Sequence, residues 1–172
     1  SILRPESPRP QLQRDDWINL NGPWSYCFDH GKSGREQDWE QSQGFDGEII
    51  VPFCPESELS GVGQTDFIEA MWYQRFIEIP ENWDGRRIQL HFGAVDYESE
   101  IYIDGKSAAR HWGGSVSFSV DITRFVTAGK KHSLVVRVHD DVRAGVQPSG
   151  KQSDRYHSYG CKYTRVTGIW QT

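Results

Sequence analysis

The stretch from His91 to Thr123, HFGAVDYESEIYIDGKSAARHWGGSVSFSVDIT, decides the fold class of this chain. Apolar residues alternate with polar ones in Glu98–Ile103 and again in Phe118–Ile122. This alternation is typical of strands that bury one face. The dipeptide Asp104-Gly105 after the first run predicts a two-residue type I′ hairpin turn, in which both residues have positive φ.

The same pattern predicts eight or nine short strands over the whole chain. They are Trp24–Phe28, Glu48–Val51, Met71–Ile79, Arg87–Phe92, Glu98–Ile103, Ser107–Arg110, Val116–Val120, Ser133–His139 and a last strand that begins near Gly168. Short strands separated by turn residues predict an all-β, antiparallel sandwich, although their spacing does not define the strand order. Residues 35–43 have room for one or two helical turns but lack a sustained helical period.

The domain organisation is simple. Residues 1–16, with three prolines and mixed charges, predict an extended arm. We expect residues 17–172 to form one domain, which is long enough to bury a core. The segment Arg143–Lys162 shows no strand pattern over its twenty residues. Long loops in compact domains tend to carry function, so we expect this segment to be the functional edge.

Composition argues against several classes of partner. The net charge of −5 disfavours nucleic acid, which requires a basic face. No run approaches the roughly 20 apolar residues that span a membrane, so we expect no membrane partner. The cysteines, Cys27, Cys54 and Cys161, are odd in number and lack CxxC spacing. This favours reduced thiols and a cytoplasmic location, with one disulfide and one free thiol as the alternative.

Five motifs extend over nearly the whole chain. They are WINLNGPWSYCFD (residues 17–29), VPFCPESELSGVG (51–63), AMWYQRFIEIP (70–80), FGAVDYESEIYIDGK (92–106) and YTRVTGIWQT (163–172). In this order they resemble the N-terminal sugar-binding domain of glycoside hydrolase family 2, the family of β-galactosidases, β-glucuronidases and β-mannosidases. The resemblance implies a jelly-roll sandwich of the galactose-binding-domain type.

The resemblance also implies a division of roles. In the family the catalytic glutamates lie in a separate barrel. We therefore expect this chain alone to lack hydrolase activity and to end before the immunoglobulin-like and barrel domains. Its parent would be a retaining exo-β-glycosidase whose partner is a carbohydrate, a β-linked galactoside or glucuronide. The domain would contribute scaffold, part of the active-site rim and subunit contacts. Its partners would be the missing C-terminal domains of the same chain and other subunits of a homo-oligomer. An autonomous carbohydrate-binding module and a domain without sugar affinity stay open as alternatives.

The residues themselves offer no catalytic pair of carboxylates. Retaining glycosidases need two carboxyl groups about 5–5.5 Å apart. Glu98 and Glu100 share the polar face of one predicted strand, which favours solvated surface charges. For Asp140-Asp141 and Asp15-Asp16 we expect turn or capping roles. Without an HExxH motif or a close Cys/His cluster, we expect neither a metal nor a cofactor.

Aromatic rings provide the candidate sugar contacts, because the C–H groups of a sugar stack on such rings. Trp112, beside a glycine pair, is either such a platform or a residue packed at the edge of the sandwich. The long loop mixes rings with charged donors, as a sugar pocket or a domain interface requires. The full set of candidate binding residues is Trp112, Asp154, Tyr159, Tyr163 and Arg165, with Arg155 and Tyr156 close by in the loop.

Two loop positions can be compared with the family pattern. In the β-galactosidase branch, an aspartate six residues before the glycine of the closing motif touches the sugar. Lys162 stands at that position here, so that contact is not expected, although Asp154 offers a carboxylate in the same loop. For Arg165, three residues before the glycine, the resemblance implies a structural role at the junction with the barrel.

Overall fold

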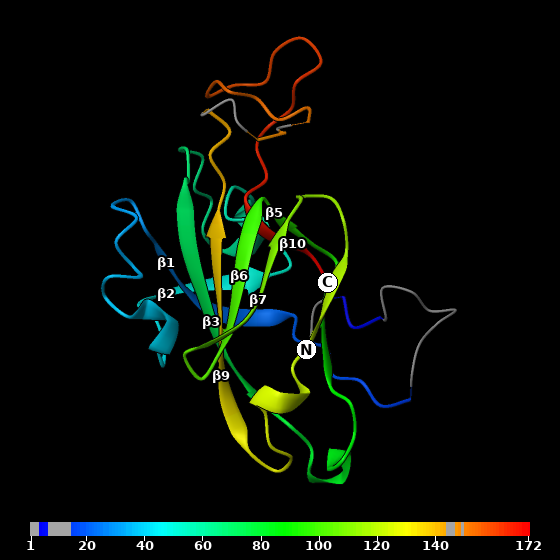
Figure 1. Ribbon diagram of the computed structural model, residues 1–172. Helices are drawn as coiled ribbons and strands as arrows, with labels where there is room; N and C mark the ends of the chain where they lie inside the picture. The colour runs from blue at the N-terminus through cyan, green and yellow to red at the C-terminus, as the bar shows by residue number, and fades with distance from the viewer. Residues whose placement is uncertain (1–3, 7–14, 144–146, 149) are drawn as a thin grey trace.

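The computed structural model describes residues 4–6, 15–143, 147–148 and 150–172 (Figure 1). Its strands are β1 (Gly22–Phe28), β2 (Gly47–Val51), β3 (Ala70–Glu78), β4 (Gln89–Phe92), β5 (Ala94–Asp96), β6 (Glu98–Ile103), β7 (Lys106–Trp112), β8 (Phe118–Asp121), β9 (Lys131–His139) and β10 (Gly168–Gln171). Single-turn 3₁₀ helices lie between them: η2 (Trp39–Gln41), η3 (Glu58–Ser60), η4 (Glu81–Trp83) and η5 (Thr123–Phe125). Within the described ranges, no helix has the length and apolarity needed to cross a membrane.

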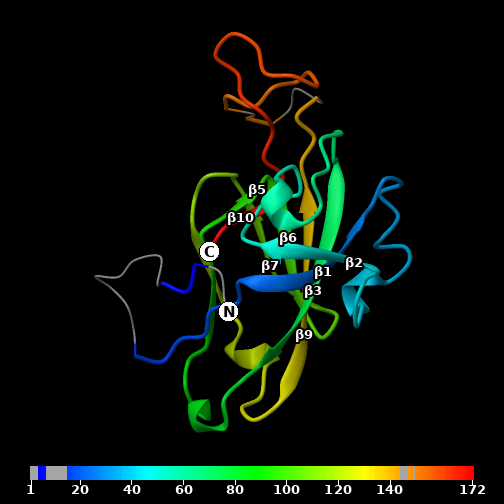
Figure 2. The same cartoon turned by 180° about the vertical axis from the view of Figure 1, so that it is seen from behind.

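The strands form two layers (Figures 1 and 2). One layer is a six-stranded antiparallel sheet in the order β2-β1-β3-β9-β6-β7. The pairs β4-β8 and β5-β10 are also antiparallel and form two ribbons. Buried side chains of both ribbons join the core cluster of the six-stranded sheet, so the ribbons cover one of its faces. This arrangement confirms the predicted all-β, antiparallel sandwich.

The alternation in the sequence produces the core between the layers. The strands β3, β9 and β6 contribute Tyr73, Val136 and Ile101, none of which has any exposed surface. Phe92 and Ile169 of the two ribbons belong to the same cluster. Because burial of apolar surface is the main favourable term in folding, this cluster is what fixes the two layers against each other.

The opposite face of the six-stranded sheet has a smaller cluster of its own. It consists of Trp72, Tyr102 and Val135, with Trp39 and Phe45 packed against it from the segment before β2. Gly34 permits this close approach, because a Cβ there would lie 2.6 Å from Nε1 of Trp72. The same Nε1 donates a hydrogen bond to Asp29 at 3.0 Å. Residues 29–46 therefore complete the sandwich on this side.

The predicted strands are present, and their bounds differ from the prediction by at most two residues. The prediction missed β5, because three residues are too few for alternation to show. The helical turn expected in residues 35–43 is the single 3₁₀ turn η2. Asp104 has a φ of 48° and Gly105 a φ of 76°, which confirms the type I′ hairpin. The arm predicted for residues 1–16 lies mostly outside the described residues.

Candidate functional site

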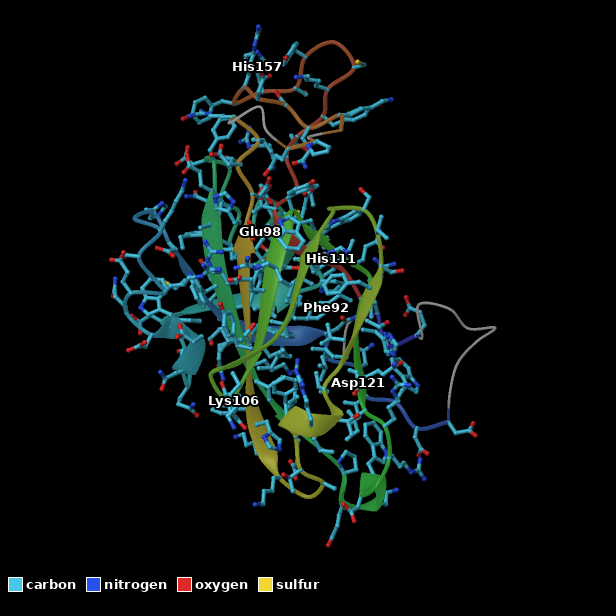
Figure 3. All side chains as sticks on the ribbon, viewed as in Figure 1. Phe92, Glu98, Lys106, His111, Asp121 and His157 are labelled. Carbon is cyan, nitrogen blue, oxygen red and sulfur yellow. The ribbon has the colours of Figure 1, made fainter. Side chains whose placement is uncertain are left out.

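One long connection, from the end of β9 to the start of β10, projects beyond the sandwich in both views (Figures 1 and 2, orange to red). Its described part contains two isolated bridges, Gln152 with Tyr163 and Tyr159 with Lys162, and no strand. His157 lies at its outer end (Figure 3). Residues 144–146 and 149 of the predicted loop lie outside the described residues. Side chains rather than a strand ladder therefore hold this loop.

A buried carboxylate just after β9 holds both ends of the loop. Oδ1 of Asp140 accepts a hydrogen bond from Nε2 of Gln147 at 2.6 Å, and its Oδ2 accepts one from Oγ1 of Thr167 at 3.1 Å. The backbone N–H of Thr167 also donates to Oε2 of Glu56 at 3.2 Å. We predicted a turn or capping role for Asp140. The structure shows that this residue is an anchor for the loop instead.

A second buried carboxylate, Asp96 at the end of β5, holds the middle of the loop. Its Oδ2 accepts a hydrogen bond from Nε2 of Gln152 at 2.6 Å. Oε1 of Gln152 in turn accepts one from the backbone N–H of Val166 at 2.8 Å. Gly114 packs so closely on Asp96 that a Cβ at this position would overlap the carboxylate. Gly114, two residues after Trp112, therefore allows this close contact with Asp96.

Burial changes the acidity of the groups at the base of the loop. It raises the pKa of Asp140 to about 7, and the nearby charge of Asp96 adds to the shift. It raises the pKa of Asp96 to about 6 and also raises the pKa of Glu56. The charged form of a carboxyl group is disfavoured where water is excluded, so these three acids hold their protons more tightly than exposed ones do.

Farther along the loop, Asp154 gathers two neighbours. Its Oδ1 accepts a hydrogen bond from the hydroxyl of Tyr159 at 2.7 Å and lies 3.4 Å from Nζ of Lys162. The hydrogen bond from Tyr159 is the main reason why the pKa of Asp154 is lowered, and Lys162 adds to the effect. Lys162, which stands where the resemblance implied an acid, therefore neutralises the carboxylate of the loop.

Arg165 clamps the loop to the segment before β3. Only 6% of its surface is exposed. Its Nη1 donates to the backbone oxygen of Arg155 at 2.6 Å, and its Nη2 donates to the backbone oxygen of Thr65. The guanidinium also lies over the ring of Phe67, with Cζ 4.0 Å from the ring centroid. This geometry supports a structural role for Arg165.

The two remaining loop candidates differ in exposure. Tyr159 is half-buried beneath Arg155, whose Cζ lies 4.3 Å from its ring centroid. Tyr163 is 64% exposed. The loop therefore links Asp154, Tyr159 and Arg165 through Arg155 and presents Tyr163 to solvent.

Trp112 lies on a different element, the edge strand β7, and is 56% exposed. It faces Glu98 across the β6–β7 hairpin, and Cζ of Arg110 lies 5.8 Å from its ring centroid. Glu98 and His111 lie at the end of the sandwich nearer the loop, and Lys106 and Asp121 lie at the other end (Figure 3). The indole of Trp112 is thus exposed at the sheet edge, and its role as a sugar platform stays a prediction.

The prediction that Glu100 is a solvated surface charge is wrong. Glu100 is buried, and its carboxylate contacts Arg35 and Arg110 and accepts a hydrogen bond from the hydroxyl of Tyr102 at 2.9 Å. Burial alone would raise the pKa of Glu100, but the hydrogen bonds from Arg35 and Arg110 outweigh it and lower the pKa. The carboxylate ties the segment before β2 to the sheet.

The site holds residues that the sequence analysis did not select. In the described ranges, no group of three or more His, Cys, Asp or Glu side chains is placed to bind a metal ion. The acids that the structure gathers at the loop base bind the loop itself. A polar residue inside the run FGAVDY was the available signal for Asp96. Phe67 carried no signal beyond its apolar side chain.

Comparison with known proteins finds one matching family and several similar glycosidases. Residues 63–145 match the family described as glycosyl hydrolases family 2, sugar binding domain. A β-glucuronidase of Paenibacillus borealis is 26% identical over 145 residues, which cover 84% of this chain and 24% of that protein. A β-galactosidase of Thermoanaerobacter pseudethanolicus is 27% identical over 156 residues, which cover 88% of this chain and 20% of that protein.

A solved structure agrees with these relatives. The β-glucuronidase of Lactobacillus rhamnosus matches with a TM-score of 0.65 and 28% identity, over 71% of this chain and 21% of that chain. The chain therefore spans about a quarter or less of the proteins that it matches here.

Proposed function

The chain contains the N-terminal sugar-binding domain of glycoside hydrolase family 2, and from this premise we propose its role in a longer enzyme. It is the non-catalytic domain of a retaining exo-β-glycosidase of the β-glucuronidase or β-galactosidase type. The substrate is a terminal β-linked glucuronide or galactoside. The domain contributes scaffold, part of the active-site rim and contacts between subunits.

The observation that carries this proposal is that four carboxylates of the chain, named below, are already bound by other groups of the same chain. Asp96 and Asp140 anchor the loop, and Asp154 is paired with Lys162. Glu100 is enclosed by arginines. A retaining glycosidase needs one carboxyl group as acid/base and a second as nucleophile, about 5–5.5 Å apart. Together with the match to a fraction of longer glycosidases, this supports catalytic groups supplied by another domain.

The loop supports the rim role. Binding residues are disproportionately found on loops that a rigid scaffold positions. This loop has a firm base, clamped by Arg165 and the buried acids, and it presents Asp154 and Tyr163 at its exposed part. It also projects from one end of the sandwich (Figure 2). A fixed base with exposed polar and aromatic side chains suits the edge of a sugar pocket.

One observation favours the second candidate, an autonomous carbohydrate-binding module. The exposed indole of Trp112 lies on the edge strand β7 beside Arg110 and Glu98. A sugar ring can stack on the indole while the two polar side chains bind its hydroxyl groups. In this role the domain would bind a polysaccharide and take no part in its hydrolysis.

Turnover by the longer enzyme tests the rim role. We expect Tyr159→Ala and Arg165→Ala to lower kcat/KM for nitrophenyl β-glucuronide or β-galactoside by about tenfold or more, as loss of a positioning contact does. Arg124→Ala is the matched control, because Arg124 is an exposed arginine in η5, three residues after Asp121, which lies at the end of the sandwich away from the loop (Figure 3). Unchanged kinetics in both loop variants would remove the loop from the active-site rim. A loss of polysaccharide binding in Trp112→Ala alone would favour the binding module.

The cysteines bear on the compartment. All three are free, with Cys27 and Cys54 half-buried and Cys161 exposed. Free thiols persist in reducing compartments. This supports our proposal of a cytoplasmic location.

A further inference from the structure

The segment before β3 places Phe67 beneath the base of the loop, where two guanidinium groups meet one ring. Cζ of Arg143 lies 3.4 Å and Cζ of Arg165 lies 4.0 Å from the centroid of Phe67. Tyr156 meets Phe67 edge-on, with the ring centroids 5.2 Å apart. These four residues, Phe67, Arg143, Tyr156 and Arg165, are named the arginine cluster below. Contacts between cations and ring faces hold it together.

The arginine cluster carries two positive charges, and the carboxylate of Asp141 accepts a hydrogen bond from the backbone N–H of Arg143 at 3.3 Å. In the part of the chain that the structure describes, neither Arg143 nor Arg165 forms an ion pair with a carboxylate. Arg165 is nearly buried, and its Nε has no hydrogen-bond partner there. Residues 143–165 hold five Arg and Lys residues and one Asp, in a chain whose net charge is −5. Burying a cation without a counter-charge is costly, so the cluster points to an anion.

The geometry also defines the kind of anion. The guanidinium of the exposed Arg143 is held by Phe67, and its N–H groups make no hydrogen bond to a described residue. A guanidinium fixed in this way presents a planar fork that fits both oxygens of a carboxylate. Tyr156 is 66% exposed, and Cζ of Arg143 lies 5.6 Å from its ring centroid. An exposed ring beside the fork suits a ligand whose carboxylate is attached to a sugar ring.

We propose that the arginine cluster binds the carboxylate of a uronic-acid saccharide, with Arg143 as the fork and Tyr156 as the platform for the sugar ring. The inference deepens the proposed function and rests on it for the placement of this loop beside a carbohydrate. It assigns the loop a preference for acidic over neutral saccharides. Arg165 serves as a positioning residue, because it fixes Phe67 and the loop backbone.

Titration of the 172-residue chain with sodium D-glucuronate, followed by ¹H–¹⁵N NMR, tests the site. We expect saturable shifts at Tyr156 and Arg143 and no comparable shifts with D-glucose. We expect Arg143→Gln to weaken binding by about tenfold or more, the loss expected when a hydrogen bond to a charged group is removed. Arg124→Gln should leave binding unchanged. Arg124 is the matched control, because it also stacks on a phenylalanine, Phe125, and no second arginine of the described ranges lies over that ring.

Other results of the titration would overturn either the proposed ligand or the binding site itself. Equal binding of inorganic sulfate and glucuronate would reduce the cluster to an anion site and overturn the saccharide. Absence of saturable shifts, or equal affinity in Arg143→Gln, would overturn the site. The result is separable from the proposed function, because turnover of Tyr159→Ala reports on the rim and glucuronate binding by Arg143→Gln reports on the cluster. Either can fail while the other holds.

Discussion

At the hairpin between β6 and β7, two residues fix the register of one edge of the sheet. Asp104 and Gly105 both have positive φ, as the right-handed twist of the flanking strands requires of a two-residue turn. The carboxylate of Asp104 also accepts a hydrogen bond from the backbone N–H of Ser133 at 2.8 Å and contacts Nδ1 of His132 at 2.6 Å. The turn therefore ties β6 and β7 to β9.

We expect Gly105→Val to destabilise the domain by about 1–3 kcal/mol, because a β-branched residue is strained at positive φ. The new side chain would also meet Gln41, whose Cγ would lie 2.8 Å from the added Cβ. Gly105→Asn is the control and should cost less, since Asn tolerates this conformation. Thermal melting of the three proteins measures the order. Equal melting temperatures for Gly105→Val and the parent chain would contradict the turn assignment.

Single residues also show where sequence reasoning ended. Alternation placed Glu100 correctly on the polar face of β6, and from this we predicted exposure. Its carboxylate is nevertheless enclosed, partly by Arg35, which lies 65 positions earlier in the chain. A pattern within one strand reports which face a residue occupies. It does not report what covers that face.

Among the structural elements, those that depend on local sequence were predicted, and contacts between distant parts of the chain were missed. The strands and the hairpin follow from a period of two and from local turn chemistry, so they could be predicted. The loop anchors could not, because Asp96 and Gln152 are 56 positions apart and Asp140 and Thr167 are 27 apart. The loop itself was predicted only as a segment without a pattern.

These anchors give the loop a pH dependence. Burial raises the pKa of Asp140 from its ordinary value of 3.8 to about 7, so the folded chain keeps a proton that the unfolded chain has already lost. The stability that this group contributes is fully present below about pH 4 and is lost as the pH rises through 7. We therefore expect Asp140→Asn to match the parent chain near pH 4 and to exceed it in stability at pH 8. Asn can accept from Gln147 and donate to Thr167, so it mimics the protonated acid.

Urea unfolding at several pH values between 4 and 8 measures this difference. Asp121→Asn is the control. Hydrogen bonds from Thr123 and Arg87 lower the pKa of exposed Asp121 to about 2, so its contribution is lost only as the pH falls below 4. The difference between Asp121→Asn and the parent chain should stay constant over the tested range. If the curves for Asp140→Asn and the parent chain run parallel, Asp140 does not titrate in this window.

Over the whole molecule, stability is distributed unevenly. The central strands β3, β9 and β6 pair with neighbours on both sides and carry side chains without exposed surface. The described loop between β9 and β10 has two isolated bridges, and side-chain hydrogen bonds hold its base. Free energies of local opening run from near zero in such segments to the global value in core strands. The part that we place at the active-site rim is thus held less firmly by the fold than the core strands are.

Hydrogen exchange of the 172-residue chain tests this distribution. We expect the amides of residues 150–163 to exchange at least about a hundredfold faster than those of β6, because the loop opens without unfolding the core. The hairpin at Asp104 and Gly105 provides an internal control, since it is also a turn but is tied to β9. Protection of the loop equal to that of β6 would contradict the uneven distribution. In the longer enzyme, contact with the catalytic domain should slow exchange in the loop and leave β6 unchanged. A loop that exchanges equally fast in both proteins would show that the catalytic domain does not cover it.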